Sequence, residues 1–166
     1  QLTELGTGKI KLYKLYNQYL SENLPPENFW HDAIDRLDLR VQTHHYSKSN
    51  IPENGRLVVI ANHAFGIADG LTICSLISKI RPDYKIITHK VLQGADHIKE
   101  KIIPLDFSKN RNALINNIAA RKESEEHLRN NGVLIIFPSG SVSTKQKLKK
   151  GIKAVDGDWK QFTSKI

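Results

Sequence analysis

The stretch RLVVIANHAFGIADG, residues 56–70, decides the fold of this 166-residue chain. Residues 56–61 form a continuous apolar run rich in β-branched side chains, and the turn pair Asn54-Gly55 precedes it. Such a run predicts a buried strand. After the polar residues Asn62 and His63, helical spacing of apolar residues predicts a helix that stops before Pro82, with Ile73, Leu76, Ile77 and Ile80 on one side. The stretch therefore reads as strand, polar loop and helix.

The same alternation continues towards the C-terminus. Further strands are expected at 84–88, within 101–107 and at 133–137, where VLIIF is again a continuous apolar run. Residues 110–130 predict a long helix that is apolar at Leu114, Ile115 and Ile118, charged in its second half, and ended by Gly132. Strands that alternate with helices predict the α/β class: a mixed, partly parallel sheet covered by helices. Sites in such sheets gather beyond the carboxyl ends of the strands.

The N-terminal 50 residues predict a helical lead-in to a core at 51–166. Leu12, Leu15, Tyr16, Tyr19 and Leu20 follow the spacing of an amphipathic helix, which either packs on the core or lies on a membrane surface. The pair Pro25-Pro26 ends it. A second short helix is expected around Trp30–Leu37, and the alternation of Leu39, Val41 and Thr43 suggests a strand. The chain begins at Gln1 and contains no Met, so we expect it to be a truncated piece of a longer chain, with a core incomplete at the C-terminus.

Composition limits the partners and excludes several classes of site. Lys and Arg total 25 against 17 Asp and Glu, a formal charge of +8, which favours anionic partners without choosing among phosphates, lipid head groups, nucleic acid or an acidic protein. The Lys-rich residues 141–166 are either a solvated surface or an anion-binding rim. The single Cys74 excludes an intrachain disulfide and a Cys-rich metal site. No apolar run approaches the roughly 18 residues of a membrane-spanning helix.

His63 and Asp69 are the candidate reactive pair. Six residues apart, they would point about 240° apart on one continuous helix, so they meet only if the intervening segment turns, which Gly66 makes easy. A carboxylate on one ring nitrogen fixes the tautomer and leaves the other nitrogen free to accept a proton from an attacking N–H or O–H group. Spacing alone leaves other interpretations open: Asp69 as a helix N-cap with His63 bonded to a backbone carbonyl, or the two as half of a metal site.

Three blocks of the sequence resemble a known family. Asn-His-x-Phe-Gly-x-x-Asp-Gly at 62–70 looks like the first signature of the glycerolphosphate and lysophospholipid acyltransferase superfamily, and its five residues between His and Asp are similar to the hemolysin-like, ornithine-lipid-type branch. Residues 103–106 followed by Arg111-Asn112 resemble the second block of that branch. Residues 137–143, Phe-Pro-Ser-Gly-Ser-Val-Ser, resemble the third. The resemblance runs from about residue 51 to 143.

The resemblance implies an acyltransferase that moves a fatty acyl group from an acyl-carrier-protein or coenzyme A thioester to an amine or a lysophospholipid hydroxyl. His63 would be the general base and Asp69 its orienting group, with no metal and no cofactor beyond the acyl thioester. It also implies a peripheral enzyme of lipid metabolism on the cytoplasmic, inner face of an anionic membrane, with no nucleic-acid partner. The implied substrate-binding residues are Asn62, Phe65, Gly66, Asp106, Asn112, Phe137, Pro138, Ser139, Gly140 and Ser141.

The chemistry of the third block can be argued separately, because a Pro-Ser-Gly-Ser turn at a strand end exposes backbone N–H groups and hydroxyls that suit an oxyanion or a phosphate; the alternative is an ordinary turn. Asp106 and Asn112 either position the acceptor or brace the loop. The chain departs from the family at Ser139, where glycerolphosphate-type enzymes commonly have Glu, and at Ser141, where the hemolysin-like branch usually has Glu. A fourth block is not found. A Ser offers no negative charge, which weakens a glycerol-phosphate acceptor. The competing hypotheses are a basic module that binds lipid or nucleic acid and a pseudoenzyme.

Other residues carry weaker signals. His44-His45 lacks Cys or carboxylate partners at ligand spacing and reads as a pair of surface histidines. Ser139 and Ser141 do not form the Gly-x-Ser-x-Gly elbow, which argues against a serine hydrolase.

Overall fold

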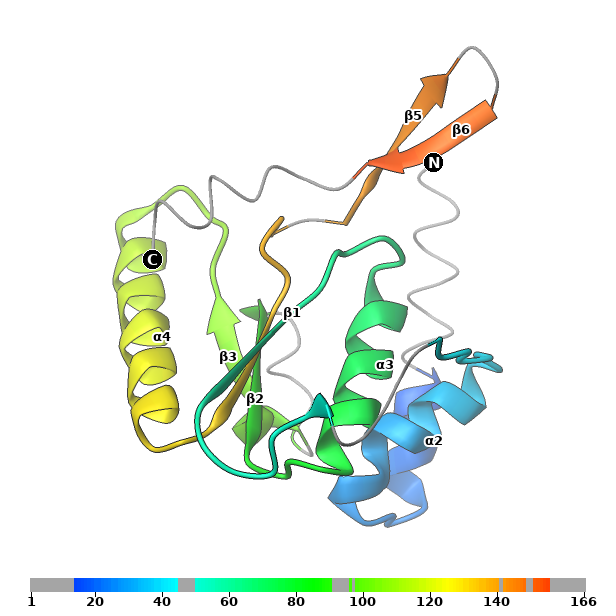
Figure 1. Ribbon diagram of the computed structural model, residues 1–166, viewed down its shortest axis with the longest axis horizontal. Coiled ribbons are helices and arrows are strands. Elements are labelled where there is room, and N and C mark those ends of the chain that lie inside the picture. Colours follow the sequence, from blue (N-terminus) through cyan, green and yellow to red (C-terminus); the bar gives the residue numbers. More distant parts are fainter. Residues whose placement is uncertain are drawn as a thin grey trace.

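The computed structural model describes residues 14–44, 50–90, 96, 98–140, 142–148 and 151–155. Its centre is a four-stranded sheet in the order β1-β4-β2-β3, and all its described pairings are parallel. The strands are β1 (Leu57–Ile60), β2 (Tyr84–His89), β3 (Ile102–Leu105) and β4 (Val133–Ile136). A separate antiparallel hairpin, β5 (Thr144–Leu148) with β6 (Gly151–Val155), projects beyond the carboxyl ends of the strands (Figure 1). The α/β class is confirmed, and its antiparallel pairing is confined to this hairpin in the described part.

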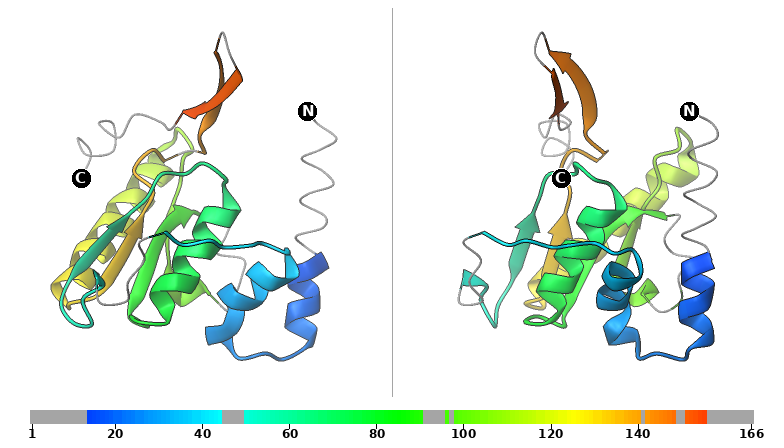
Figure 2. Two further views of the ribbon diagram at one scale, coloured as in Figure 1. Left: turned by 45° about the vertical axis from the view of Figure 1, so that its right-hand side comes forward. Right: turned by 90° about the vertical axis from the view of Figure 1, so that its right-hand side faces the viewer.

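Helices cover the two faces of the sheet. Helix α3 (Ile67–Ser78) and, outside it, α2 (Phe29–Arg36) lie on one face, while α4 (Arg111–Arg129) lies on the other (Figures 1 and 2). Short 3-10 turns at η1 (Pro26–Asn28) and η4 (Lys99–Lys101) precede α2 and β3. Helix α3 connects β1 to β2 and α4 connects β3 to β4. Strands β1 and β4 are neighbours in the sheet although five other elements separate them in the sequence.

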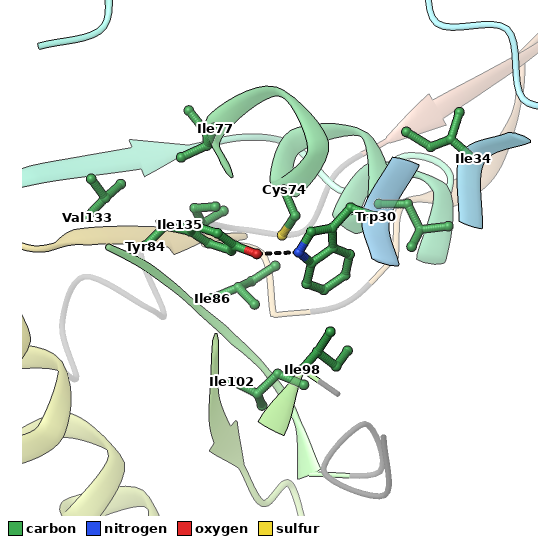
Figure 3. Close-up of a cluster of buried hydrophobic side chains, with 11 residues drawn as sticks. Trp30, Ile34, Cys74, Ile77, Tyr84, Ile86, Ile98, Ile102, Val133 and Ile135 are labelled. Carbon is green, nitrogen blue, oxygen red and sulfur yellow. Dashed lines mark hydrogen bonds between the residues drawn. The ribbon is translucent and has the colours of Figure 1, made fainter. Parts of the chain in front are cut away.

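The larger core lies between the sheet and the layer of α2 and α3. Figure 3 shows Trp30 of α2 directed at Tyr84 of β2, with its indole N–H donating to the Tyr84 hydroxyl and Cys74 of α3 beside the pair. Burial beside Cys74 raises the pKa of Tyr84, so this hydroxyl stays protonated and can accept from the indole. Because Trp30 and Ile34 belong to this core, the N-terminal segment packs on the α/β unit. The division at residue 50 stays a prediction.

Several expected elements differ from the observed ones. Residues 39–43 form no strand, since they pair with no other strand and Val41 is exposed; only Leu39 packs against the core. Strand β1 is an edge strand with Val58 and Ile60 exposed, not the fully buried strand expected, whereas β4 is buried along its whole length.

The face of helix α4 that packs on the sheet is not the one predicted from its large apolar residues. Its buried residues are the small Ala113, Ala120 and Ser124, while Leu114, Ile115 and Ile118 are exposed. Small side chains allow the helix axis to lie close to β3 and β4, and of the large apolar residues of the helix only Leu128 packs against this core.

The N-terminal helix is described over residues 14–21, and Leu12, which the sequence predicts to be part of it, lies outside the described residues. Tyr19 is buried, and the rings of Tyr16 and Tyr19 both meet Phe29 edge to face, with centroids 6.2 and 5.3 Å apart respectively. These contacts favour the interpretation of a helix packed on the core for this part of the segment.

Arg81 ties together the loops at the amino end of the sheet. Its guanidinium is buried and donates to the carbonyl oxygens of Pro52, Gly55 and Asn131 at 2.7 to 2.9 Å, and to the Asp83 carboxylate. One side chain therefore holds the segments that lead into β1, β2 and β4.

Helix α4 ends in a Schellman arrangement. The Gly132 N–H donates to the carbonyl of His127 and the Asn131 N–H to that of Leu128, both at 3.0 Å, and Asn131 adopts a left-handed φ of 63°. The expected stop at Gly132 is right in place, but Asn131 supplies the left-handed residue. Gly132 is required for space, because a Cβ there would lie 2.3 Å from the His127 ring.

Candidate active site

His63 and Asp69 meet where β1 ends, as the sequence predicts. The Nδ1 atom of His63 lies 3.1 Å from Oδ2 of Asp69, and the two side chains are 21% and 17% exposed. Among the described residues, no hydrogen-bond partner is found for the other ring nitrogen, Nε2. The pair therefore has the arrangement of a general base: one nitrogen held by a carboxylate and the other available to a proton donor.

Gly66 makes this geometry possible. It adopts φ 64° and ψ −122° immediately before α3, a backbone conformation that side chains rarely tolerate, and its carbonyl accepts from the Asp69 N–H at 3.1 Å. The chain turns sharply here, so that Asp69 in the first turn of α3 faces back towards His63. The turn expected at Gly66 is confirmed.

Asp69 also stabilises the beginning of α3. Its Oδ2 accepts the backbone N–H of Phe65 at 2.8 Å, so one carboxylate oxygen receives both that N–H and the His63 ring. This resembles a capping box, in which a side chain in the first turn reaches back to the N–H groups before the helix. Asp69 is therefore not the N-cap of α3, which is Gly66, but its carboxylate both stabilises the start of the helix and contacts the His63 ring.

The third sequence block lies against the pair. The ring of Phe137, which follows β4, stacks on His63 with centroids 4.4 Å apart and planes 25° apart. The Ser143 N–H donates to the His63 carbonyl, and Val142 lies close to Gly66, where an added Cβ would be 3.5 Å from its side chain. Since β1 and β4 are adjacent and parallel, residues that follow them emerge side by side.

Within that block, the turn at 137–140 is partly closed on itself. The Gly140 N–H donates to the Phe137 carbonyl at 3.0 Å, and Gly140 has a left-handed φ of 64°. Pro138 is buried and Ser139 is half-buried, while Ser141 lies outside the described residues. The expectation that this turn exposes its backbone N–H groups is therefore wrong for Gly140, whose N–H closes the turn.

Asp106, from the second block, makes internal bonds. Its buried carboxylate accepts from Lys90 Nζ at 2.8 Å and from the Ser108 N–H at 3.0 Å. The side-chain amide of Asn117 makes two hydrogen bonds with the backbone of Asp106: it accepts from the Asp106 N–H and donates to the Asp106 carbonyl. The Lys90 ammonium, followed by the Ser108 hydroxyl and N–H, holds the pKa of Asp106 well below its usual range. These contacts favour the loop-bracing interpretation.

The remaining predicted residues lie at the same end of the sheet. Asn62 and Phe65 are exposed in the loop after β1, and Asn112 is exposed in the first turn of α4, whose N-cap is Asn110. Sequence reasoning missed the partners of the second block. Lys90 follows β2, and the register of β2 beside β3 brings it to Asp106. Asn117 reaches Asp106 from α4, which packs beside β3.

Other chemistries find less support in the described residues. Cys74 is buried, and burial raises the pKa of its thiol, so it is not an activated nucleophile. Within the described ranges no three His, Cys, Asp or Glu side chains are grouped to hold a metal ion. Over the same residues, no helix combines the length and apolar character needed to cross a membrane.

Comparison with known families agrees with this geometry. Residues 42–157, more than half of the chain, match the Acyltransferase family. The match includes both members of the His63–Asp69 pair and all three sequence blocks. The chain therefore belongs to the acyltransferase family, which supports its place in the glycerolphosphate and lysophospholipid acyltransferase superfamily. Neither the comparison with curated proteins nor that with solved structures gives a match.

Proposed function

We propose that this acyltransferase moves a fatty acyl group from a thioester of acyl carrier protein or coenzyme A to an amine or a lysophospholipid hydroxyl. The observation that carries the proposal is the His63–Asp69 pair, with Nδ1 held at 3.1 Å and Nε2 without a described partner, at the carboxyl edge of a parallel sheet. His63 is the general base and Asp69 its positioning residue.

In the proposed reaction, Nε2 of His63 accepts the proton of the acceptor N–H or O–H as the nitrogen or oxygen attacks the thioester carbonyl carbon. The new C–N or C–O bond forms, the C–S bond breaks, and the thiolate takes the proton from the imidazolium. The products are the acylated acceptor and the free thiol. Asp69 stabilises the imidazolium while it exists and holds the ring in the tautomer that leaves Nε2 unprotonated. The stacked Phe137 ring limits rotation of the imidazole.

Charge supports the proposed partners. The net charge of +8 suits an acidic carrier protein or the phosphates of coenzyme A, as well as an anionic membrane. A peripheral position on the inner, cytoplasmic face of the membrane follows from these partners and from a lipid acceptor. The hemolysin-like branch is proposed from the five-residue spacing between His63 and Asp69, and it favours an amine acceptor of the ornithine-lipid type.

The specific observation for a second candidate is that the third block carries no Glu, neither at Ser139, as in glycerolphosphate-type enzymes, nor at Ser141, as in the hemolysin-like branch. A chain that kept the scaffold but lost acceptor binding would be a non-catalytic basic domain that holds anionic lipid. Salt-sensitive binding to acidic vesicles without any acyl transfer would identify this case.

The test is acyl transfer by wild type and His63→Ala, with acyl-carrier-protein and coenzyme A thioesters offered to an amine and to a lysophospholipid. We expect wild type to transfer the chain and His63→Ala to lose about 100-fold or more, since a positioned general base contributes roughly 10²–10⁴ in rate.

His44→Ala is the matched control, because His44 is exposed and lies in the segment before β1. It should keep wild-type turnover. Undiminished transfer by His63→Ala would remove the base assignment, and no transfer by wild type with any donor would favour the second candidate.

A further inference from the structure

Among the described residues, seven of the eleven exposed large apolar side chains lie near one end of the sheet; Val41, Val58, Ile60 and Val155 lie elsewhere. Phe65 and Ile67 follow β1, Phe107 follows β3 and Val142 follows β4, so all four lie at the carboxyl edge, beside the His63 site. Phe65 is 80% exposed and Phe107 53%. Exposed apolar residues that occur singly need no explanation, but a group of them at one edge of a domain marks a surface that meets an apolar partner.

Helix α4 extends this apolar surface. It starts at the carboxyl edge because it follows β3, and its first half exposes Leu114, Ile115 and Ile118 (Figure 1). Its second half is charged, with Arg121, Lys122, Glu125, Glu126 and Arg129. The N-terminal half of α4, near the site, therefore has an apolar outer side, and its C-terminal half has a charged one.

Positive charge accompanies the apolar side chains. Lys90, Lys109 and Arg111 are exposed at the same edge. Of the described acidic side chains at this edge, Asp69 faces His63 and Asp106 faces Lys90. The β5–β6 hairpin projects from the same end (Figure 1). An apolar surface with a basic rim is complementary to a bilayer with anionic head groups.

We propose that the carboxyl edge of the sheet docks on an anionic lipid bilayer, with the strands steep to its plane and the first two turns of α4 inserted among the head groups. We call the docking surface the apolar rim; it consists of Phe65, Ile67, Phe107, Leu114, Ile115, Ile118 and Val142. This inference deepens the proposed function and rests on it for the lipid acceptor, which would reach His63 directly from the bilayer. The partner of this surface is an anionic membrane rather than a second copy of the chain. The rim combines apolar residues with cations, and a second copy with the same positive charge would be repelled.

Two tryptophan variants on the same side of α4 test the orientation. Ile118→Trp places a fluorophore on the apolar rim, and Arg129→Trp places one eleven residues further along, about 16 Å at 1.5 Å per residue. Each is mixed with phosphatidylcholine–phosphatidylglycerol vesicles whose acyl chains carry bromine, and the wild-type signal of the two native Trp residues is subtracted. We expect the added emission of Ile118→Trp to shift to the blue and be quenched, and that of Arg129→Trp to stay unchanged.

Loss of binding is measured separately by vesicle sedimentation. Leu114→Gln with Ile118→Gln should weaken binding to the phosphatidylglycerol vesicles by roughly tenfold or more, since two apolar side chains would no longer be removed from water on docking. The control pairs Glu125→Gln with Arg129→Gln, which leaves the net charge unchanged at the far end of α4 and should bind as wild type does. Both pairs replace exposed side chains.

The outcomes separate this inference from the proposed function. Equal quenching of both Trp variants, or undiminished vesicle binding after Leu114→Gln with Ile118→Gln, would overturn the apolar rim. So would light scattering that shows a dimer dispersed by this double variant, because the rim would then be a contact between copies. His63→Ala should still bind vesicles. If it also kept full acyl transfer, the catalytic assignment would fail while the docking surface stood.

Discussion

Replacing Asp69 by Asn separates the charge of this residue from its hydrogen bonds. Both donors that meet it, the His63 Nδ1–H and the Phe65 N–H, reach the same oxygen, Oδ2, at 3.1 and 2.8 Å. An amide oxygen in that place can accept both, so Asp69→Asn should keep the turn and the His63 tautomer while it removes the negative charge beside the imidazolium.

The size of the effect follows from the separation of the charges. Two unit charges about 4 Å apart interact by about 4 kcal/mol at an effective dielectric constant near 20. Because Asp69 and His63 are both about one-fifth exposed, solvent screening reduces this to roughly 2 kcal/mol. Since 1.36 kcal/mol corresponds to tenfold in rate, kcat should fall about 30-fold. Asp69→Ala also removes both hydrogen bonds and should fall roughly 100- to 1,000-fold below wild type.

The assay is steady-state acyl transfer together with urea unfolding of the same variants. Asp69→Ala should lose about 1 kcal/mol of unfolding free energy, as for a lost N-terminal helix cap, and Asp69→Asn much less. Asp35→Asn, which removes an exposed carboxylate from α2, is the control and should keep wild-type turnover. The reasoning is refuted if both Asp69 variants turn over at the wild-type rate while Asp69→Ala loses stability, because the residue would then only cap α3.

The remaining predictions concern stability and its dependence on pH. Arg81→Ala leaves three loop carbonyls and a carboxylate without their donor and should cost about 3 kcal/mol in urea unfolding; a cost below 1 kcal/mol would show that the loops hold without it. Because its lysine partner lowers the pKa of Asp106 from the usual 3.8, this carboxylate stabilises the fold above that pH, and the contribution is lost as the pH falls towards the folded-state pKa. Asp106→Asn should thus be less stable than wild type at pH 7, with a gap that narrows on acidification below about pH 4; a gap independent of pH would contradict the ion pair. Gly132→Ala must displace the His127 ring and should cost about 1–2 kcal/mol, whereas Gly70→Ala, with open space around it, should not destabilise; equal unfolding midpoints would show that the ring moves freely.

Local patterns predicted most of the elements. The apolar runs at 57–60 and 133–136 and the helical spacing after Gly66 and Asn110 all correspond to observed strands and helices, because periodicity acts within a single element. The face that each element buries was not predicted as well, since Leu114, Ile115 and Ile118 of α4 are exposed. The strand order was not predictable in the same way. The edge strand β1 and the central strand β4 have equally apolar sequences. Only the pairing of the strands in the sheet shows that Val58 and Ile60 of β1 are exposed.

In the candidate site, too, local contacts could be predicted from the sequence and contacts between distant segments could not. The His63–Asp69 pair could be predicted because both residues and the glycine that turns the chain lie within one short stretch. The stacking of Phe137 on His63 depends on β4 lying beside β1, and the Lys90–Asp106 ion pair depends on β2 lying beside β3. Contacts between segments so distant in the sequence follow from the topology, for which no local pattern gives a signal.

The most direct test of the central claim is the tautomer of the His63 ring, read from its two imidazole ¹⁵N chemical shifts at a pH where the ring is neutral. The account predicts a proton on Nδ1, facing Asp69, and none on Nε2, with the two tautomers mixed in Asp69→Ala. A neutral ring with its proton on Nε2 in wild type would contradict the account, because the nitrogen turned away from the carboxylate could then accept nothing from an acceptor.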